Sequence, residues 1–116
     1  MLFFDSAIRI WICIEPVDLR KGFDGLYGLV TSLMKEQPSN GGLYLFINTS
    51  RTRIKILGFD GTGLWVMSKR LCKGTFSWPT GVDIKDGKIQ LEPEALSLLL
   101  AGVDLKGAKL RPWYQR

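Results

Sequence analysis

Histidine is absent from this 116-residue sequence, and cysteine is scarce. Without an imidazole group the chain cannot form a Ser-His-Asp or Cys-His relay, and zinc sites that use histidine are excluded too. The two cysteines, Cys13 and Cys72, lie far apart, and neither belongs to a CxxC pair. Because no signal-peptide pattern accompanies them, we expect two reduced thiols and a cytoplasmic protein.

Long apolar runs are also missing. The most apolar stretch, residues 1–14, contains Asp5 and Arg9 and falls short of the ~20 residues that a membrane-spanning helix needs. We therefore expect no membrane association. The glycine-rich phosphate-binding loop that ends in Lys-Ser or Lys-Thr is absent as well, which excludes the common plan for nucleotide hydrolysis.

The composition is that of a folded protein, since 46% of the residues are hydrophobic and 23% are charged. The length suits one domain, and we predict a single α+β domain over residues 1–105. The final segment, 106–116, has four basic residues, one proline and no acid. We predict that it forms a basic, irregular tail.

Periodic patterns predict a mostly antiparallel sheet and two helices. Runs of β-branched and aromatic residues indicate four strands, and Asp60-Gly61 marks a hairpin turn between the last two. Apolar residues at three- and four-residue intervals indicate the first helix, while Pro93 and Gly102 mark the ends of the second. The predicted strands lie near 8–14, 43–48, 53–59 and 64–71, the last three as a central meander, and the helices near 22–36 and 92–101.

The meander has two faces of different character. If Asn48 lies opposite Arg53 and Phe59 opposite Leu64, alternation along the strands separates a basic and aromatic face from an apolar one. The first face carries Tyr44, Phe46, Asn48, Arg53, Lys55, Ser68 and Arg70, and the second carries Leu45, Ile47, Ile54, Ile56, Trp65 and Met67.

The basic excess of the chain falls within this meander. Residues 51–73 contain six basic residues and one acid, whereas the rest of the chain contains ten of each, so the whole net charge of +5 lies in this segment. A nucleic-acid backbone supplies closely spaced negative charge, and exposed aromatic rings stack on unpaired bases. We predict a nucleic-acid-binding face that comprises Arg51, Arg53, Lys55, Lys69, Arg70, Lys73, Tyr44 and Phe46.

Another interpretation of these residues stays open. Basic side chains are common on the solvated face of an antiparallel sheet, and Tyr44 and Phe46 would be structural if they lay beneath the helix near 22–36. Lys69 fits the basic face poorly, because alternation places it on the apolar face. Its ammonium group would then extend past the apolar surface, or the residue would lie beyond the end of the strand.

A second hypothesis is a protein adaptor. Trp, Tyr and Arg dominate the energetics of protein interfaces, and we predict a partner-binding patch that comprises Phe76, Trp78, Trp113 and Tyr114. The alternative is that the aromatic residues near Pro79 close the end of the sheet.

An enzymatic function is the weakest of the three hypotheses. A metal-dependent nuclease needs several carboxylates that meet at the metal ions, but Asp18 and Asp24 lie near a helix start and Asp60 lies in a turn. Capping and turn roles explain these positions. We therefore predict no catalytic residues, no metal site and no cofactor.

The sequence also resembles a known family through four ordered blocks. The blocks are VDLRKGFDGL at 17–26, LYLFIN at 43–48, RTRIKIL at 51–57 with Asp60-Gly61-Thr62-Gly63, and Lys69-Arg70-Leu71 with Gly74, Phe76, Trp78 and Pro79. Over roughly residues 8–103 the chain resembles the TnpB, or Orf2-like, accessory proteins of the insertion sequence 66 family of bacterial mobile elements. It differs at Gly58-Phe59, where the family usually has a bulkier aromatic pair, and at Cys72, where an acid is usual.

The resemblance implies a biological process rather than a chemical activity. Such elements encode this small protein beside a separate, larger transposase that carries the catalytic acids. We therefore predict a non-catalytic transposition accessory protein that binds DNA through its basic sheet face and has the transposase of the same element as a partner. The alternative is an adaptor that contacts the transposase without binding DNA itself.

Overall fold

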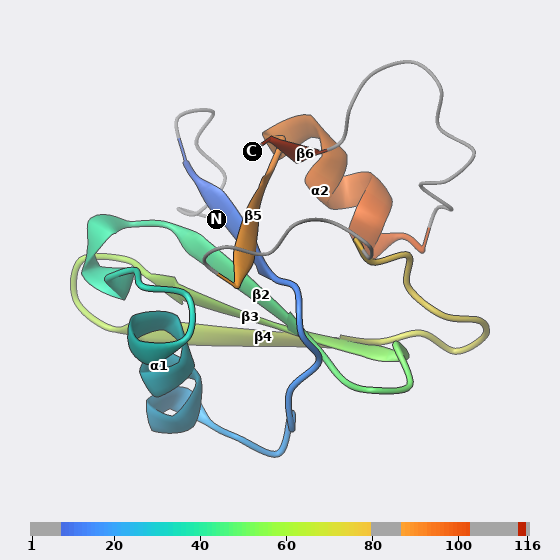
Figure 1. Ribbon diagram of the computed structural model, residues 1–116, viewed down its shortest axis with the longest axis horizontal. Helices are drawn as coiled ribbons and strands as arrows, with labels where there is room; N and C mark the ends of the chain where they lie inside the picture. Colours follow the sequence, from blue (N-terminus) through green and yellow to red (C-terminus); the bar gives the residue numbers. More distant parts are fainter. Residues whose placement is uncertain (1–7, 80–86, 103–113, 116) are drawn as a thin grey trace.

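The computed structural model describes residues 8–79, 87–102 and 114–115. They form one six-stranded sheet in the order β4-β3-β2-β1-β5-β6, with helix α1 on one face and helix α2 on the other (Figure 1). The strands are β1 (Ile10–Cys13), β2 (Leu43–Ile47), β3 (Arg53–Phe59), β4 (Leu64–Arg70), β5 (Lys88–Leu91) and β6 (Tyr114–Gln115). The helices are α1 (Phe23–Ser32), α2 (Pro93–Leu100) and the short 3₁₀ helix η1 (Pro38–Asn40).

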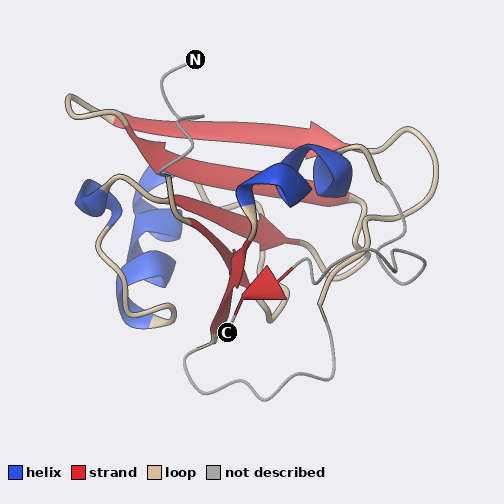
Figure 2. Ribbon diagram, turned by 90° about the horizontal axis from the view of Figure 1, so that it is seen from above, coloured by secondary structure: helices blue, strands red, loops and turns tan. Residues whose placement is uncertain are grey.

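The central strands combine a meander with one parallel pair. Strands β2, β3 and β4 are successive antiparallel neighbours, whereas β1 and β2 are parallel. Parallel neighbours need a long crossover connection, which α1 and η1 provide here. On its other side β1 pairs antiparallel with β5. The short strand β6 pairs antiparallel with β5 and forms that edge of the described sheet, which Figure 2 shows from above.

Side chains within the turns fix the register of the meander. The Asn48 side-chain oxygen accepts the backbone N–H groups of Thr52 and Arg53, both at 3.0 Å, and so closes the connection between β2 and β3. Asp60 does the same between β3 and β4, because its Oδ1 accepts the N–H groups of Thr62 and Gly63, each at 2.9 Å. Gly61 adopts a left-handed φ of 98°, which favours glycine.

Each face of the sheet has its own hydrophobic core. Leu26, Val30 and Met34 cover Tyr44 and Phe46 on the α1 side. The α2 side holds Leu45, Ile47, Ile54 and Ile56 from the sheet, together with Phe76, Trp78, Leu96 and Leu99. All five residues of β2 are therefore buried, because both faces of this central strand are covered.

The predicted α+β class, the four strands and the two helices are confirmed, and their observed bounds lie within the predicted ranges. The predicted register is also confirmed: Arg53 pairs with Arg70 and Phe59 with Leu64, and the N–H of Asn48 donates to Arg53 O at 3.2 Å.

The sequence patterns did not predict β6, the parallel pair or the pairing of β5 with β1. Strand β6 differs at Tyr114–Gln115 from the irregular tail that we predicted. The other residues of that tail lie outside the described residues. Within the described ranges, neither helix has the length and apolar character that crossing a bilayer requires.

Candidate nucleic-acid interface

Two arginines face each other at one end of the sheet. Arg53 begins β3, Arg70 ends β4, and the two are direct cross-strand partners. Lys55 lies two residues further along β3, opposite Ser68. Alternation places all four side chains on the α1 face. Within the described ranges, no carboxylate forms an ion pair with either arginine, so their like charges lie side by side without an internal counterion.

The loops at this end of the sheet add further cations. The N–H of Phe76 donates to Arg51 O at 2.7 Å, and the N–H of Leu71 donates to Thr52 O at 3.0 Å. These two bonds attach the segment that contains Lys73 to the loop between β2 and β3. The ammonium group of Lys55 donates to Lys21 O at 3.1 Å, which holds the chain before α1 beside β3. We call this set the basic end; it comprises Lys21, Arg51, Arg53, Lys55, Arg70 and Lys73.

Asp18 and Asp60 form their hydrogen bonds away from the Arg53–Arg70 pair, although the charge of Asp18 also attracts Lys21 of the basic end. Asp18 binds its own neighbour, Arg20, with a closest contact of 2.8 Å, and the hydrogen bonds from Arg20 hold the pKa of Asp18 well below its usual range. Asp60 lies in the turn at the opposite end of the β3–β4 hairpin. There it accepts the indole N–H of Trp65 at 2.7 Å, and this bond, with the turn N–H groups, keeps its pKa well below the usual range.

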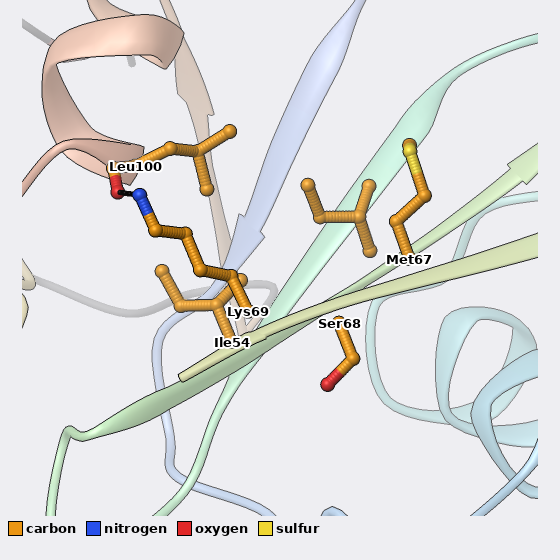
Figure 3. Close-up of a pocket in the computed structure, with 6 residues that line it drawn as sticks. Ile54, Met67, Ser68, Lys69 and Leu100 are labelled. Carbon is orange, nitrogen blue, oxygen red and sulfur yellow. Dashed lines mark hydrogen bonds between the residues drawn. The ribbon is translucent and has the colours of Figure 1, made fainter. Parts of the chain in front are cut away.

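Lys69 does not belong to this surface. It lies on the α2 face, opposite Ile54, and its ammonium group donates to Leu100 O at 2.7 Å. The lysine stem covers apolar residues while the charge reaches the carboxyl end of α2, as Figure 3 shows. The alternation that places Lys69 on the apolar face is confirmed, and the inclusion of Lys69 in the predicted nucleic-acid-binding face is wrong.

The predicted stacking rings are not accessible. Tyr44 and Phe46 are both 0% exposed and lie in the core beneath α1. The Tyr44 hydroxyl donates to Gln37 O at 3.2 Å, and burial raises the pKa of Tyr44 to about 12. The prediction that these rings stack on bases is wrong, and the structural interpretation is correct.

The predicted adaptor patch is also buried where the structure describes it. Phe76 and Trp78 are 1% and 5% exposed, and the Trp78 indole donates to Cys13 O at 3.1 Å. These residues close the core on the α2 side instead of presenting an exposed hot spot. Trp113 and the side chain of Tyr114 lie outside the described residues.

Two exposed aromatic residues escaped the sequence prediction. Phe23 is 51% exposed at the start of α1, two residues after Lys21, and Trp65 is 48% exposed on β4. Phe23 follows the apolar period of the helix but precedes its first buried residue, Leu26. Trp65 lies on the face that we assigned to the core, but β4 is the last strand of the sheet. The sequence did not show that β4 is an edge strand, and this position leaves Trp65 partly uncovered.

No group of three or more acidic or cysteine side chains in the described part of the chain is arranged to hold a metal ion. The predictions of no metal, no cofactor and no catalytic residue stay predictions.

The fold and the surface define a small α+β protein with one mixed sheet and a group of cations, the basic end, at one end of the β3–β4 hairpin. The chain belongs to the IS66 Orf2-like family, whose family model matches residues 8–110. It is similar to two proteins of Sinorhizobium fredii (strain NBRC 101917 / NGR234). It shares 35% identity with uncharacterized protein y4jC over 91% of this chain and 88% of the relative. It shares 36% identity with uncharacterized protein y4hO over 90% of this chain and 88% of that relative.

No solved structure gives a significant match. Membership of the IS66 Orf2-like family suggests an accessory role in transposition and so agrees with the process that the sequence resemblance implied.

Proposed function

We propose that this chain is a non-catalytic accessory protein of transposition that binds DNA through its basic end. The observation that carries the proposal is the direct pairing of Arg53 with Arg70. Like charges opposite each other on adjacent strands destabilise a sheet, and a bound anion would relieve that repulsion.

DNA phosphates suit this arrangement. A guanidinium group forms paired hydrogen bonds with phosphate oxygens, and Lys55, Arg51 and Lys73 extend the positive surface on both sides of the arginine pair. The one acid of residues 51–73, Asp60, lies at the far end of the hairpin, so the segment presents its cations without interruption at the other end.

Burial of Tyr44 and Phe46 favours contacts to the DNA backbone rather than to the bases. Phosphate contacts carry no direct sequence information, so we expect the affinity to depend strongly on salt and weakly on base sequence. Recognition of the element ends would then require a partner, for which we propose the transposase of the same element.

The test is a fluorescence anisotropy titration of a labelled element-end duplex at several salt concentrations. If about five phosphates are neutralised, log K should fall against log salt with a slope near −4.5. Replacing both Arg53→Gln and Arg70→Gln should weaken binding and reduce the slope by about 2.

The matched control is Lys69→Gln, which removes one charge from the same strand on the opposite face. It should leave the slope unchanged, and a scrambled duplex should bind almost as well as the element end. Absence of salt-sensitive binding, or an equal loss in Lys69→Gln and in the double arginine variant, would show that the basic end is not a DNA-binding surface.

A further inference from the structure

Among the described residues, no strand pairs with the outer edge of β4. Strand β4 is the terminal strand of the described sheet, and all seven of its residues pair with β3 on the other side. An exposed strand edge is a template for another strand. Cationic residues commonly protect such edges, but here Lys69 and Arg70 occupy only the last two positions of the strand.

Hydrogen bonds at the two ends of the hairpin show which backbone groups face outward. Gly63 O accepts the N–H of Asp60 at 3.1 Å, and the N–H of Leu71 donates to Thr52 O at 3.0 Å. Groups of an antiparallel strand alternate between its two sides, so the odd-numbered residues of β4 bond to β3. The outward N–H and C=O groups therefore belong to Leu64, Val66, Ser68 and Arg70.

We propose that this edge pairs with β4 of a second copy of the chain, antiparallel and centred on Met67. In this register Met67 lies opposite its own counterpart, Trp65 opposite Lys69, Leu64 opposite Arg70 and Val66 opposite Ser68. It overlaps the whole length of both strands. The two pairs that exchange backbone hydrogen bonds are Leu64 with Arg70 and Val66 with Ser68, and all four of these residues face outward.

The charges of β4 favour this register. Neither Lys69 nor Arg70 faces another cation, because one lies opposite an indole ring and the other opposite leucine. An ammonium group near a Trp ring gains a cation–π attraction, and Lys69 uses one of its three donors on Leu100 O. A register centred on Lys69 would place two ammonium groups opposite each other and is therefore disfavoured.

An apolar hollow next to the edge supports a second copy as the occupant. The hollow has a volume of about 120 Å³ and lies between β3, β4 and the end of α2 (Figure 3). Its lining comprises Ile54, Ile56, Met67, Ser68, Lys69 and Leu100.

Strand pairing would bring a large apolar group to the rim of this hollow. Trp65 is 48% exposed and shares the α2 face with Met67 and Lys69 by alternation along β4. In the proposed register, Trp65 of the partner subunit stands beside Lys69. The pairing thus covers an exposed ring and an open apolar hollow together, and it does so twice because the interface is isologous.

The pairing also determines where the two basic ends of the dimer lie relative to each other. Its two-fold axis is perpendicular to the sheet, so both α1 faces lie on the same side. The two Arg70 residues are six strand positions apart, or about 20 Å. The dimer would present both basic ends on one surface, but its formation does not depend on the proposed DNA binding.

Measurement of mass against concentration tests the dimer. A seven-residue strand pair is a small interface, so we expect a dissociation constant in roughly the micromolar range. Light scattering coupled to gel filtration should show a monomer–dimer equilibrium in the full chain. Met67→Lys, which places two cations opposite each other, should remain monomeric, whereas Leu98→Lys adds the same charge on α2 and should dimerise like the parent.

A cysteine test fixes the register even if Met67→Lys fails to fold. In the Cys72→Ser background, Met67→Cys places two thiols in a non-hydrogen-bonded pair with Cα atoms about 4.5 Å apart, which suits a disulfide. Mild oxidation should cross-link this variant into a homodimer. Trp65→Cys is the control, because its counterpart lies four positions away, and it should cross-link far less. A monomer at every concentration, or equal cross-linking of the two cysteine variants, would overturn the proposal.

Discussion

The ammonium group of Lys69 donates a hydrogen bond to the main-chain carbonyl of Leu100 at 2.7 Å. Leu100 is the last residue of α2, where unpaired carbonyl groups and the helix dipole favour a cation. Its neighbour in sequence, Arg70, lies on the opposite face and pairs with Arg53. Two adjacent cations of one strand therefore have separable roles, the first structural and the second part of the basic end.

This separation predicts opposite phenotypes for two matched substitutions. Lys69→Met should lower the free energy of unfolding by about 0.5–1 kcal/mol, because it removes the hydrogen bond to the end of α2. Arg70→Met should raise the free energy of unfolding slightly, by less than about 0.5 kcal/mol, because it relieves the like-charge pairing with Arg53, but it should weaken DNA binding. Urea denaturation and anisotropy titration of both variants measure the two effects. If both properties changed together in both variants, the division of roles would be wrong.

The core beneath α1 predicts a different outcome for the aromatic residues of β2. Phe46 is fully buried, so Phe46→Leu leaves a small cavity and should cost about 1–2 kcal/mol. DNA affinity of the folded variant should equal that of the parent, since the ring is inaccessible to bases. Denaturation in urea and DNA titration at one temperature check this pair of outcomes, and a selective loss of DNA affinity would restore the stacking role.

The sequence predicted the strand positions and their register because local signals determine both. Asp60-Gly61 requires a turn, and alternation then assigns Arg53 and Arg70 to one face. The burial of Tyr44 and Phe46 had a signal too: all five residues from Leu43 to Ile47 are apolar. Such a run is typical of a strand that is covered on both faces.

Other features depend on contacts between distant parts of the chain. The bond from Trp78 to Cys13 O spans 65 residues, and β5 pairs with β1 from the other end of the sequence. No local period indicates that Phe76 and Trp78 turn inward, because this depends on where β1 and α2 lie. For the same reason, the six basic residues of the segment 51–73 did not reveal from sequence which of them form the basic end. Its membership depends on where three loops lie in the folded chain.

The buried phenol of Tyr44 predicts a loss of stability at alkaline pH. Its pKa is raised from 10.0 to about 12, mainly by burial, so the unfolded chain releases this proton first. The stabilisation is complete below pH 10 and is lost as the pH rises from 10 to about 12. Tyr44→Phe removes this titrating group, so its free energy of unfolding should fall less steeply over that range. Denaturation series for both proteins measure the difference, and parallel curves would contradict the prediction.

The two free cysteines predict stepwise thiol labelling. Cys72 is exposed and Cys13 is buried, and burial raises the pKa of Cys13 to about 11, so this residue carries little of the reactive thiolate at neutral pH. With a chromogenic disulfide reagent at pH 8, the native protein should release one equivalent of chromophore quickly and the second only on unfolding. Cys72→Ser should abolish the fast phase, whereas Cys13→Ala should preserve it at a cost in stability. Rapid labelling of both thiols in the folded protein would contradict the buried position of Cys13 in the core beneath α1.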